Sequence, residues 1–238
     1  MRNFTFNKEK HYYELDGKRL YGVTTILSVL AKPALIQWSA NMAIDFIQVA
    51  LNEKLELTPE LLKDARNAHR KKKETAGDWG TEMHAWIEKE VKARISKEDS
   101  SLLMPTDEKQ KECAENFLKW IDSNKVTFLE SEKHLYSKDL FLGGIVDLVC
   151  EIDGQVWIVD VKTGSGIYFE AFWQMGGYEL LLKEMGFEKP VTGYIVLNLK
   201  KDGTFTERRS ISNEDNKKGF LACLDIYRIS EKVKNQII

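Results

Sequence analysis

The chain has 238 residues, 43% of them apolar and 11% aromatic, which is enough for a large hydrophobic core and excludes an intrinsically disordered protein. Its 35 Lys and Arg residues against 37 Asp and Glu residues give a formal charge of -2. This balance excludes a protein that coats nucleic acid through bulk positive charge, so any anionic partner must be held by a local patch.

The three cysteines indicate a reducing compartment. Cys113, Cys150 and Cys223 are far apart, odd in number and form no CxxC pair, which argues against a thiolate-held zinc or iron–sulfur site. The first ten residues lack the apolar core of a signal peptide, and no apolar run approaches the length of a membrane span. We therefore expect a cytoplasmic protein with no membrane association.

The first half of the chain is predicted to be helical after a short extended start. That start runs from Tyr12 to Tyr21 and turns at Asp16-Gly17. Three prolines lie where helices are expected to begin, because the missing N–H of proline costs nothing there. The predicted helices are Thr24 to Leu30, Pro33 to Leu51, Pro59 to Lys73, Gly77 to Arg94 and Pro105 to Ser123.

From residue 126 onward, alternating and β-branched runs predict strands. The predicted strands are Val126 to Tyr136, Leu142 to Ile152, Gln155 to Thr163, Val191 to Leu199 and Thr204 to Arg209. A helix is expected from Tyr168 to Met185, and another from Asn213 to Lys234. This order predicts an α/β protein with a mixed sheet and helices on its faces.

The dipeptide Asp153-Gly154 between apolar runs predicts a two-residue hairpin, because a type I′ turn needs positive φ at both central residues. Ile152 then faces Gln155, and counting back along both strands brings Asp147 directly opposite Asp160. Lys162 shares their face. The other face carries apolar residues that would anchor this register: Val146, Leu148, Cys150, Trp157, Val159 and Val161.

Two opposed carboxylates repel each other unless one is protonated or a cation lies between them. A divalent metal would resolve the conflict. Lys162 would also neutralise one charge, so an ordinary cross-strand salt-bridge cluster is the alternative at this point.

Other residues are predicted to lie near Asp147 and Asp160, and each also has an ordinary structural explanation. Gly143-Gly144 indicates a close approach or merely the end of a turn. Gln174 and Tyr178 lie one helical turn apart, flanking Gly176-Gly177, which a close approach of this helix to the sheet would explain; a kinked helix would explain it as well.

His84 borders the apolar stripe of its helix and is either a ligand or a packing residue. A basic run suits phosphate binding or a solvated helix face; it comprises Arg70, Lys71, Lys72 and Lys73.

Taken together, these elements resemble the PD-(D/E)xK nuclease superfamily. They are Gly144-Ile145-Val146-Asp147, Asp160-Val161-Lys162, the Q-x-x-x-Y pair Gln174 and Tyr178, and the upstream Gly80-Thr81-Glu82-Met83-His84. The chain is most similar to the RecB-like branch, which includes CRISPR adaptation exonucleases, the mitochondrial genome-maintenance exonuclease and many phage exonucleases. The resemblance covers about Gly80 to Leu199. It implies a restriction-endonuclease-like mixed central sheet flanked by helices, with a helical N-terminal half.

The resemblance also implies roles for individual residues. Asp147, Asp160, the Val161 carbonyl and His84 would bind Mg²⁺ or Mn²⁺, and Lys162 would position or activate the attacking water. Gln174 and Tyr178 would orient Lys162 and the scissile phosphate, with Glu132 as a supporting acid behind the ligands. The four-cysteine set of the adaptation exonucleases is missing, so no iron–sulfur cluster is expected.

The expected function is a metal-dependent DNA exonuclease acting on single-stranded ends, in phage or bacterial replication, recombination or repair. A restriction-type or structure-selective endonuclease and a catalytically inactive nucleic-acid-binding module are the alternatives. A helicase or recombination partner cannot be named from the sequence. We expect a single domain, residues 1–238. In it a mostly helical part, residues 1–124, covers the site, because His84 lies within it, and residues 125–238 form the nuclease core.

Overall fold

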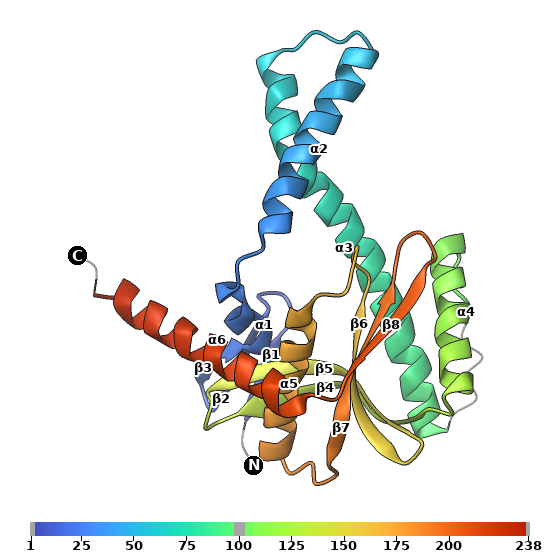
Figure 1. The fold of residues 1–238 in the computed structure, drawn as a ribbon, viewed down its shortest axis with the longest axis vertical. Coiled ribbons are helices and arrows are strands. Elements are labelled where there is room, and N and C mark those ends of the chain that lie inside the picture. The colour runs from blue at the N-terminus through green and yellow to red at the C-terminus, as the bar shows by residue number, and fades with distance from the viewer. Residues whose placement is uncertain (1–2, 98–102, 237–238) are drawn as a thin grey trace. The chain divides into compact units, whose positions relative to one another are not determined.

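A computed structural model describes residues 3–97 and 103–236 (Figure 1). The chain forms two compact units, each with its own packing. The smaller unit comprises Leu30–Glu82, and the larger one comprises Met1–Val29 together with Met83–Ile238. Within the described ranges, no helix is long and apolar enough to span a membrane.

The smaller unit is built from helix α2, Pro33–Asn52, and the first part of helix α3, Pro59–Ser96. Both helices begin at their predicted proline. The Trp38 and His69 rings meet edge to face, with centroids 6.3 Å apart, and so join the two helices.

Helix α3 differs from the prediction, which had two helices, Pro59 to Lys73 and Gly77 to Arg94, with a break between them. The structure has one helix of 38 residues over this stretch. A single glycine costs a helix only about 1 kcal/mol relative to alanine, and no proline accompanies it. The Gly77 carbonyl also accepts a hydrogen bond from Thr81 Oγ1 at 2.9 Å.

The larger unit contains a mixed sheet, so the predicted α/β fold class is confirmed. In the described part of the chain the sheet has eight strands in the order β1-β2-β3-β5-β6-β7-β8, with β4 paired to β5 off this path. The strands are β1 Phe4–Asn7, β2 Tyr12–Leu15, β3 Lys18–Gly22, β4 Thr127–Ser137, β5 Leu142–Ile152, β6 Gln155–Lys162, β7 Val191–Leu199 and β8 Phe205–Ser210. Among the strand pairs of the described residues, β3–β5 and β6–β7 are parallel and the others are antiparallel. Strand β1 was not predicted.

Helices of the larger unit contact this sheet, and a 3-10 turn contacts two of those helices. They are α1 Val23–Ile26, the 3-10 turn η1 Leu27–Val29, α4 Glu108–Ser123, α5 Phe169–Glu184 and α6 Asn213–Lys234. Helix α5 contacts β4, β5, β6 and β7, and α6 packs on α5. Helix α4 begins at Glu108 rather than at the predicted Pro105, because the Asp107 side chain accepts from the Gln110 N–H at 2.8 Å and caps the helix.

The predicted hairpin between β5 and β6 is confirmed. Asp153 and Gly154 have φ values of 50° and 75°, and the pairing runs from Ile152–Gln155 to Leu148–Val159 in the predicted register. The expected apolar face is buried throughout: Val146, Leu148, Cys150, Trp157, Val159 and Val161. Cys150 is one of three free, buried cysteines.

The two glycine pairs lie at close contacts. A Cβ at Gly144 would lie 2.7 Å from Tyr178 Cε1, which allows α5 to lie close to β5. In contrast, a Cβ at Gly176 would lie 2.9 Å from the Asn216 backbone, and one at Gly177 would lie 2.8 Å from the Phe220 ring. The glycines of α5 therefore accommodate α6, whereas the sequence analysis expected them to accommodate the sheet.

We predict that Gly176→Ala destabilises the protein by about 1–3 kcal/mol, because the new methyl group meets backbone that cannot move aside as a side chain can. Urea denaturation measures this change. Gly164→Ala is the control, since a Cβ there would meet nothing within 4 Å, and its stability should be unchanged or slightly higher. Equal stability of the two variants would contradict the packing described for α5 and α6.

Candidate metal centre

Strand β5 has a gap in its pairing, and Asp147 lies in that gap. One edge of β5 pairs with β4 from Leu142 to Glu151. The other edge pairs with β3 through Leu142 and Gly143, and with β6 only from Leu148 onward, among the described residues. Asp147 and Asp160, next in line after Leu148 and Val159, are not a ladder pair. Instead, Val161 donates its backbone N–H to Asp147 Oδ2 at 2.8 Å.

A bulge in β4 brings a second acid opposite Asp147. Phe128 pairs with Cys150, but Glu130 pairs with Val149, so β4 carries one extra residue at this point. Beyond the bulge Ser131 pairs with Leu148 and Lys133 with Val146. Glu132 therefore lies across from Asp147. Without the bulge, Ser131 would occupy this position.

The backbone of Glu132 is strained. Its φ of 46° lies in the left-handed region, which is unfavourable for a residue with a side chain, particularly inside a strand. Backbone strain of this kind persists where the surrounding structure enforces it and is common at functional sites.

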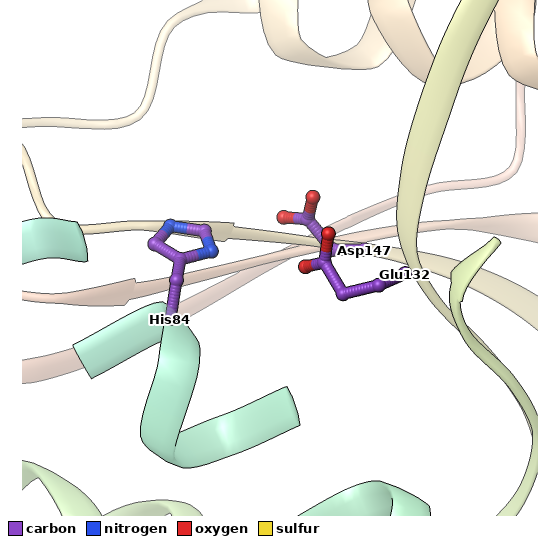
Figure 2. Close-up of side chains that lie close together, drawn as sticks. All are labelled: His84, Glu132 and Asp147. Atoms are coloured by element: carbon purple, nitrogen blue, oxygen red, sulfur yellow. The ribbon is translucent and has the colours of Figure 1, made fainter. Parts of the chain in front are cut away.

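His84 completes the cluster from helix α3. One ligand atom each from His84, Glu132 and Asp147 lie within 4.8 Å of one another, and all three side chains are half-buried. Figure 2 shows the imidazole on its helical turn facing the two carboxylates. The neighbouring Met83 and Ile87 are buried, so packing of α3 holds the imidazole in this orientation.

The two acids are electrostatically in conflict. Burial, followed by the charge of Asp147, raises the pKa of Glu132 to about 7. A divalent cation between the carboxylates would remove the repulsion. Carboxylate oxygens with one imidazole are a donor set that Mn²⁺ and Mg²⁺ accept.

Asp160 and Lys162 form a separate pair beside this cluster. The Asp160 side chain is 2% exposed, and Lys162 Nζ lies 2.8 Å from Oδ1 and from Oδ2. The contact to Oδ2 lacks hydrogen-bonding geometry, so that buried oxygen has no hydrogen bond. Burial raises the pKa of Asp160, and the charge of Lys162 opposes this effect.

Helix α5 supplies two further polar groups. Gln174 Nε2 donates to Asp160 Oδ1 at 3.2 Å and to Tyr178 Oη at 3.0 Å. Burial, and then the charges of Asp147 and Asp160, raise the pKa of Tyr178 well above its ordinary value. Tyr178 is therefore a neutral hydrogen-bonding group at this site.

The structure thus places the residues singled out from the sequence in four sets. His84 and Asp147 lie together, with Glu132 rather than Asp160 as the third member. Asp160, Lys162, Gln174 and Tyr178 are linked by direct contacts. Val161 contacts Asp147 through its N–H. The four basic residues from Arg70 to Lys73 are exposed and belong to the smaller unit.

Glu132 was predicted to be a supporting acid behind the ligands, and the structure places one of its carboxylate oxygens within 4.8 Å of ligand atoms of His84 and Asp147. Its place opposite Asp147 depends on the bulge between Phe128 and Glu130, and no glycine or proline in β4 announces that bulge. In the sequence, the one indication of a role for Glu132 was its acidic side chain on the predicted strand that precedes Asp147.

Comparisons with known proteins bear on this site. Residues 50–228 match the family described as the PD-(D/E)XK nuclease superfamily. No curated protein matches the chain. The solved structure described as "Crystal structure of SSO0001" is similar with a TM-score of 0.30 and 11% sequence identity. That match covers 48% of this chain and 57% of that one, so the chain spans little more than half the length of the structure it matches.

We predict that Glu132→Gln raises the melting temperature of the metal-free protein by about 1–3 °C, because it removes a repulsion on the order of 0.2–1 kcal/mol between opposed strands. In the unmodified protein, Mn²⁺ should raise the melting temperature further, and the Glu132→Gln variant should lose most of that increase. Thermal unfolding in chelator and in Mn²⁺ measures both effects.

Glu151→Gln is the matched control on β5, because the Glu151 carboxylate has its own cation, Lys189, at 3.0 Å. In chelator, the melting temperature of that variant should not exceed that of the unmodified protein. Mn²⁺ should raise its melting temperature by as much as it does for the unmodified protein. A full Mn²⁺ response of the Glu132 variant would exclude Glu132 as a ligand.

Proposed function

Because the chain belongs to the PD-(D/E)XK nuclease superfamily, we propose that it is a divalent-metal-dependent DNA exonuclease that hydrolyses phosphodiester bonds at single-stranded ends. The observation that carries this proposal is the cluster of His84, Glu132 and Asp147 beside the Asp160–Lys162 pair. Within the superfamily we favour the RecB-like branch, in phage or bacterial replication, recombination or repair in the cytoplasm.

The residues at the site fit a divalent cation. The His84, Glu132 and Asp147 ligand atoms converge, and Asp160 contributes a buried carboxylate oxygen, Oδ2, that has no hydrogen bond. We propose all four as ligands, with the Val161 backbone close by through its contact with Asp147. A bound Mg²⁺ or Mn²⁺ would lower the pKa of water and offset the negative charge on the phosphate.

Lys162 would supply the cationic group that positions the attacking water. Burial acts to lower its pKa, but the charges of Asp160 and Asp147 and the hydrogen bond to Asp160 outweigh that effect and raise it. Lys162 therefore stays protonated near neutral pH and serves as a hydrogen-bond donor. Gln174 and Tyr178 would hold the Asp160 carboxylate and the scissile phosphate in orientation.

The basic run on α3 is the proposed contact with the DNA backbone. Arg70, Lys72 and Lys73 are exposed, and Lys71 forms an exposed ion pair with Asp64 at 3.3 Å that phosphate groups would replace at little cost. We propose that the helical part of the chain admits a threaded single strand and thereby makes cleavage depend on a free end.

A catalytically inactive binding module is disfavoured by the residues present. Asp147, Asp160, Lys162 and Gln174 are all of the types that the chemistry needs, and the last three are connected by hydrogen bonds. A protein that only bound DNA would gain stability by losing the opposed acids.

We predict that Asp160→Asn, Asp147→Asn and Lys162→Ala each reduce hydrolysis of end-labelled single-stranded DNA at least about 100-fold, with the fold retained. Lys133→Ala is the control for the lysine, because Lys133 is also half-buried and ion-paired, with Glu130 on β4. It should cleave normally. Undiminished activity of Asp160→Asn, or activity in excess chelator, would refute the proposed reaction.

We further predict that a linear single strand is degraded with Mn²⁺ while a covalently closed circle of the same sequence is not, because threading requires an end. A time course on a denaturing gel distinguishes shortening from the end from internal cuts. Efficient cutting of the circle would instead indicate an endonuclease with the same site.

A further inference from the structure

Asn198 on β7 is an unusual residue for a protein core. Its side chain is 0% exposed, and neither Oδ1 nor Nδ2 has a hydrogen-bond partner among the described residues. A buried amide without partners lowers stability, since water would have satisfied both atoms in the unfolded chain. An apolar side chain of the same shape would be more stable here. The position therefore calls for a functional reason.

The sheet places Asn198 next to Lys162. Strands β6 and β7 run parallel, and their register pairs Asp160 with Val196 and Lys162 with Asn198. Paired residues on neighbouring strands share a face of the sheet, so the amide and the lysine stem are direct neighbours. On its other side Asn198 pairs with Thr206 of β8.

Lys162 needs a second acceptor if a cation binds to Asp160. Without a cation, its ammonium group lies 2.8 Å from both Asp160 oxygens. A dication on Asp160 Oδ2 would repel that ammonium group, which lies 2.8 Å from the same oxygen. The repulsion would weaken the hydrogen bond from Lys162 to Asp160 Oδ1, which is the only one that Lys162 makes to a side chain in the described part of the chain. Asn198 Oδ1 is a neighbouring acceptor that is still unused.

We propose that Asn198 is a positioning residue that accepts a hydrogen bond from Lys162 when a divalent cation binds to Asp160. The inference rests on the proposed function, because it requires a cation at this site. It gives the unpartnered amide a role: Asn198 makes metal binding easier by holding the displaced lysine, and it keeps that lysine beside the reacting phosphate.

Asn198→Leu tests this role, because leucine keeps the approximate shape and removes both polar atoms. The metal-free variant should melt at a higher temperature than the unmodified protein. Its affinity for Mn²⁺, measured by calorimetry without DNA, should fall about tenfold. Loss of a residue that supports a metal ligand typically lowers metal affinity by about 10- to 100-fold, and we expect the lower end of that range. Turnover at saturating Mn²⁺ should fall as well.

A double-mutant cycle isolates the contact with Lys162. In a Lys162→Ala background there is no lysine to displace, so Asn198→Leu should no longer change the affinity for Mn²⁺. An equal loss of affinity in both backgrounds would overturn the proposal, as would an unchanged affinity in the single variant.

Two further controls keep the test decisive. The variants Asn198→Thr and Asn198→Val replace the leucine variant if that one folds poorly. Threonine and valine have similar shapes, but only threonine keeps a hydrogen-bond acceptor, so the threonine variant should bind Mn²⁺ more tightly than the valine variant. Asn216→Leu removes a buried amide that has a partner, Ser210 Oγ at 2.9 Å, and should lower stability without changing Mn²⁺ affinity. Failure of the unmodified protein to bind Mn²⁺ would refute the proposed function itself, whereas binding with no effect at Asn198 refutes this inference alone.

Discussion

The hydrogen bond from the Val161 N–H to Asp147 Oδ2 holds the candidate site together. It lies where the pairing of β5 with β6 stops, and it uses a side-chain oxygen in place of a ladder carbonyl. Strand β6 continues alongside β7, while β5 continues alongside β4. Asp147 is therefore tied to both halves of the sheet. Together with the β5–β6 ladder from Leu148–Val159 to Ile152–Gln155, this bond helps to set the positions of Glu132 and Lys162 relative to each other.

Several features near this connection cost stability. Two acids face each other across β4 and β5, Glu132 has a left-handed backbone, and Asn198 is buried without partners. Each is unfavourable in a metal-free protein considered alone. The large apolar core of β5, β6 and β7 supplies the stability that offsets them. Their concentration around Asp147 and Lys162 is what distinguishes this region from an ordinary salt-bridge cluster.

Helix α5 links the core to the site. Its glycines allow α6 to pack closely on one side, and Tyr178 packs over Gly144 on another. These contacts fix the rotation of α5, and with it the reach of Gln174 to Asp160 and Tyr178. A change in helix packing far from the acids would therefore alter the orientation of Asp160.

The sequence by itself determined the mixed α/β fold, most of the strands and the register of the β5–β6 hairpin. That register is local: a two-residue turn at Asp153-Gly154 dictates which residues face each other. Helical periodicity likewise put Gln174 and Tyr178 on one side of a helix. The predicted pairing of Asp147 with Asp160 was not found, because the β5–β6 ladder stops at Leu148–Val159 and Asp147 Oδ2 accepts from the Val161 N–H instead. Only the tertiary structure decided that Glu132 faces Asp147, because a bulge without a glycine or proline signal shifts β4 by one residue. It also decided that His84 turns toward the acids, that α3 continues through Gly77 and that the α5 glycines face α6. These features depend on contacts between segments distant in the chain, whose energies outweigh the local preferences that a sequence pattern reports.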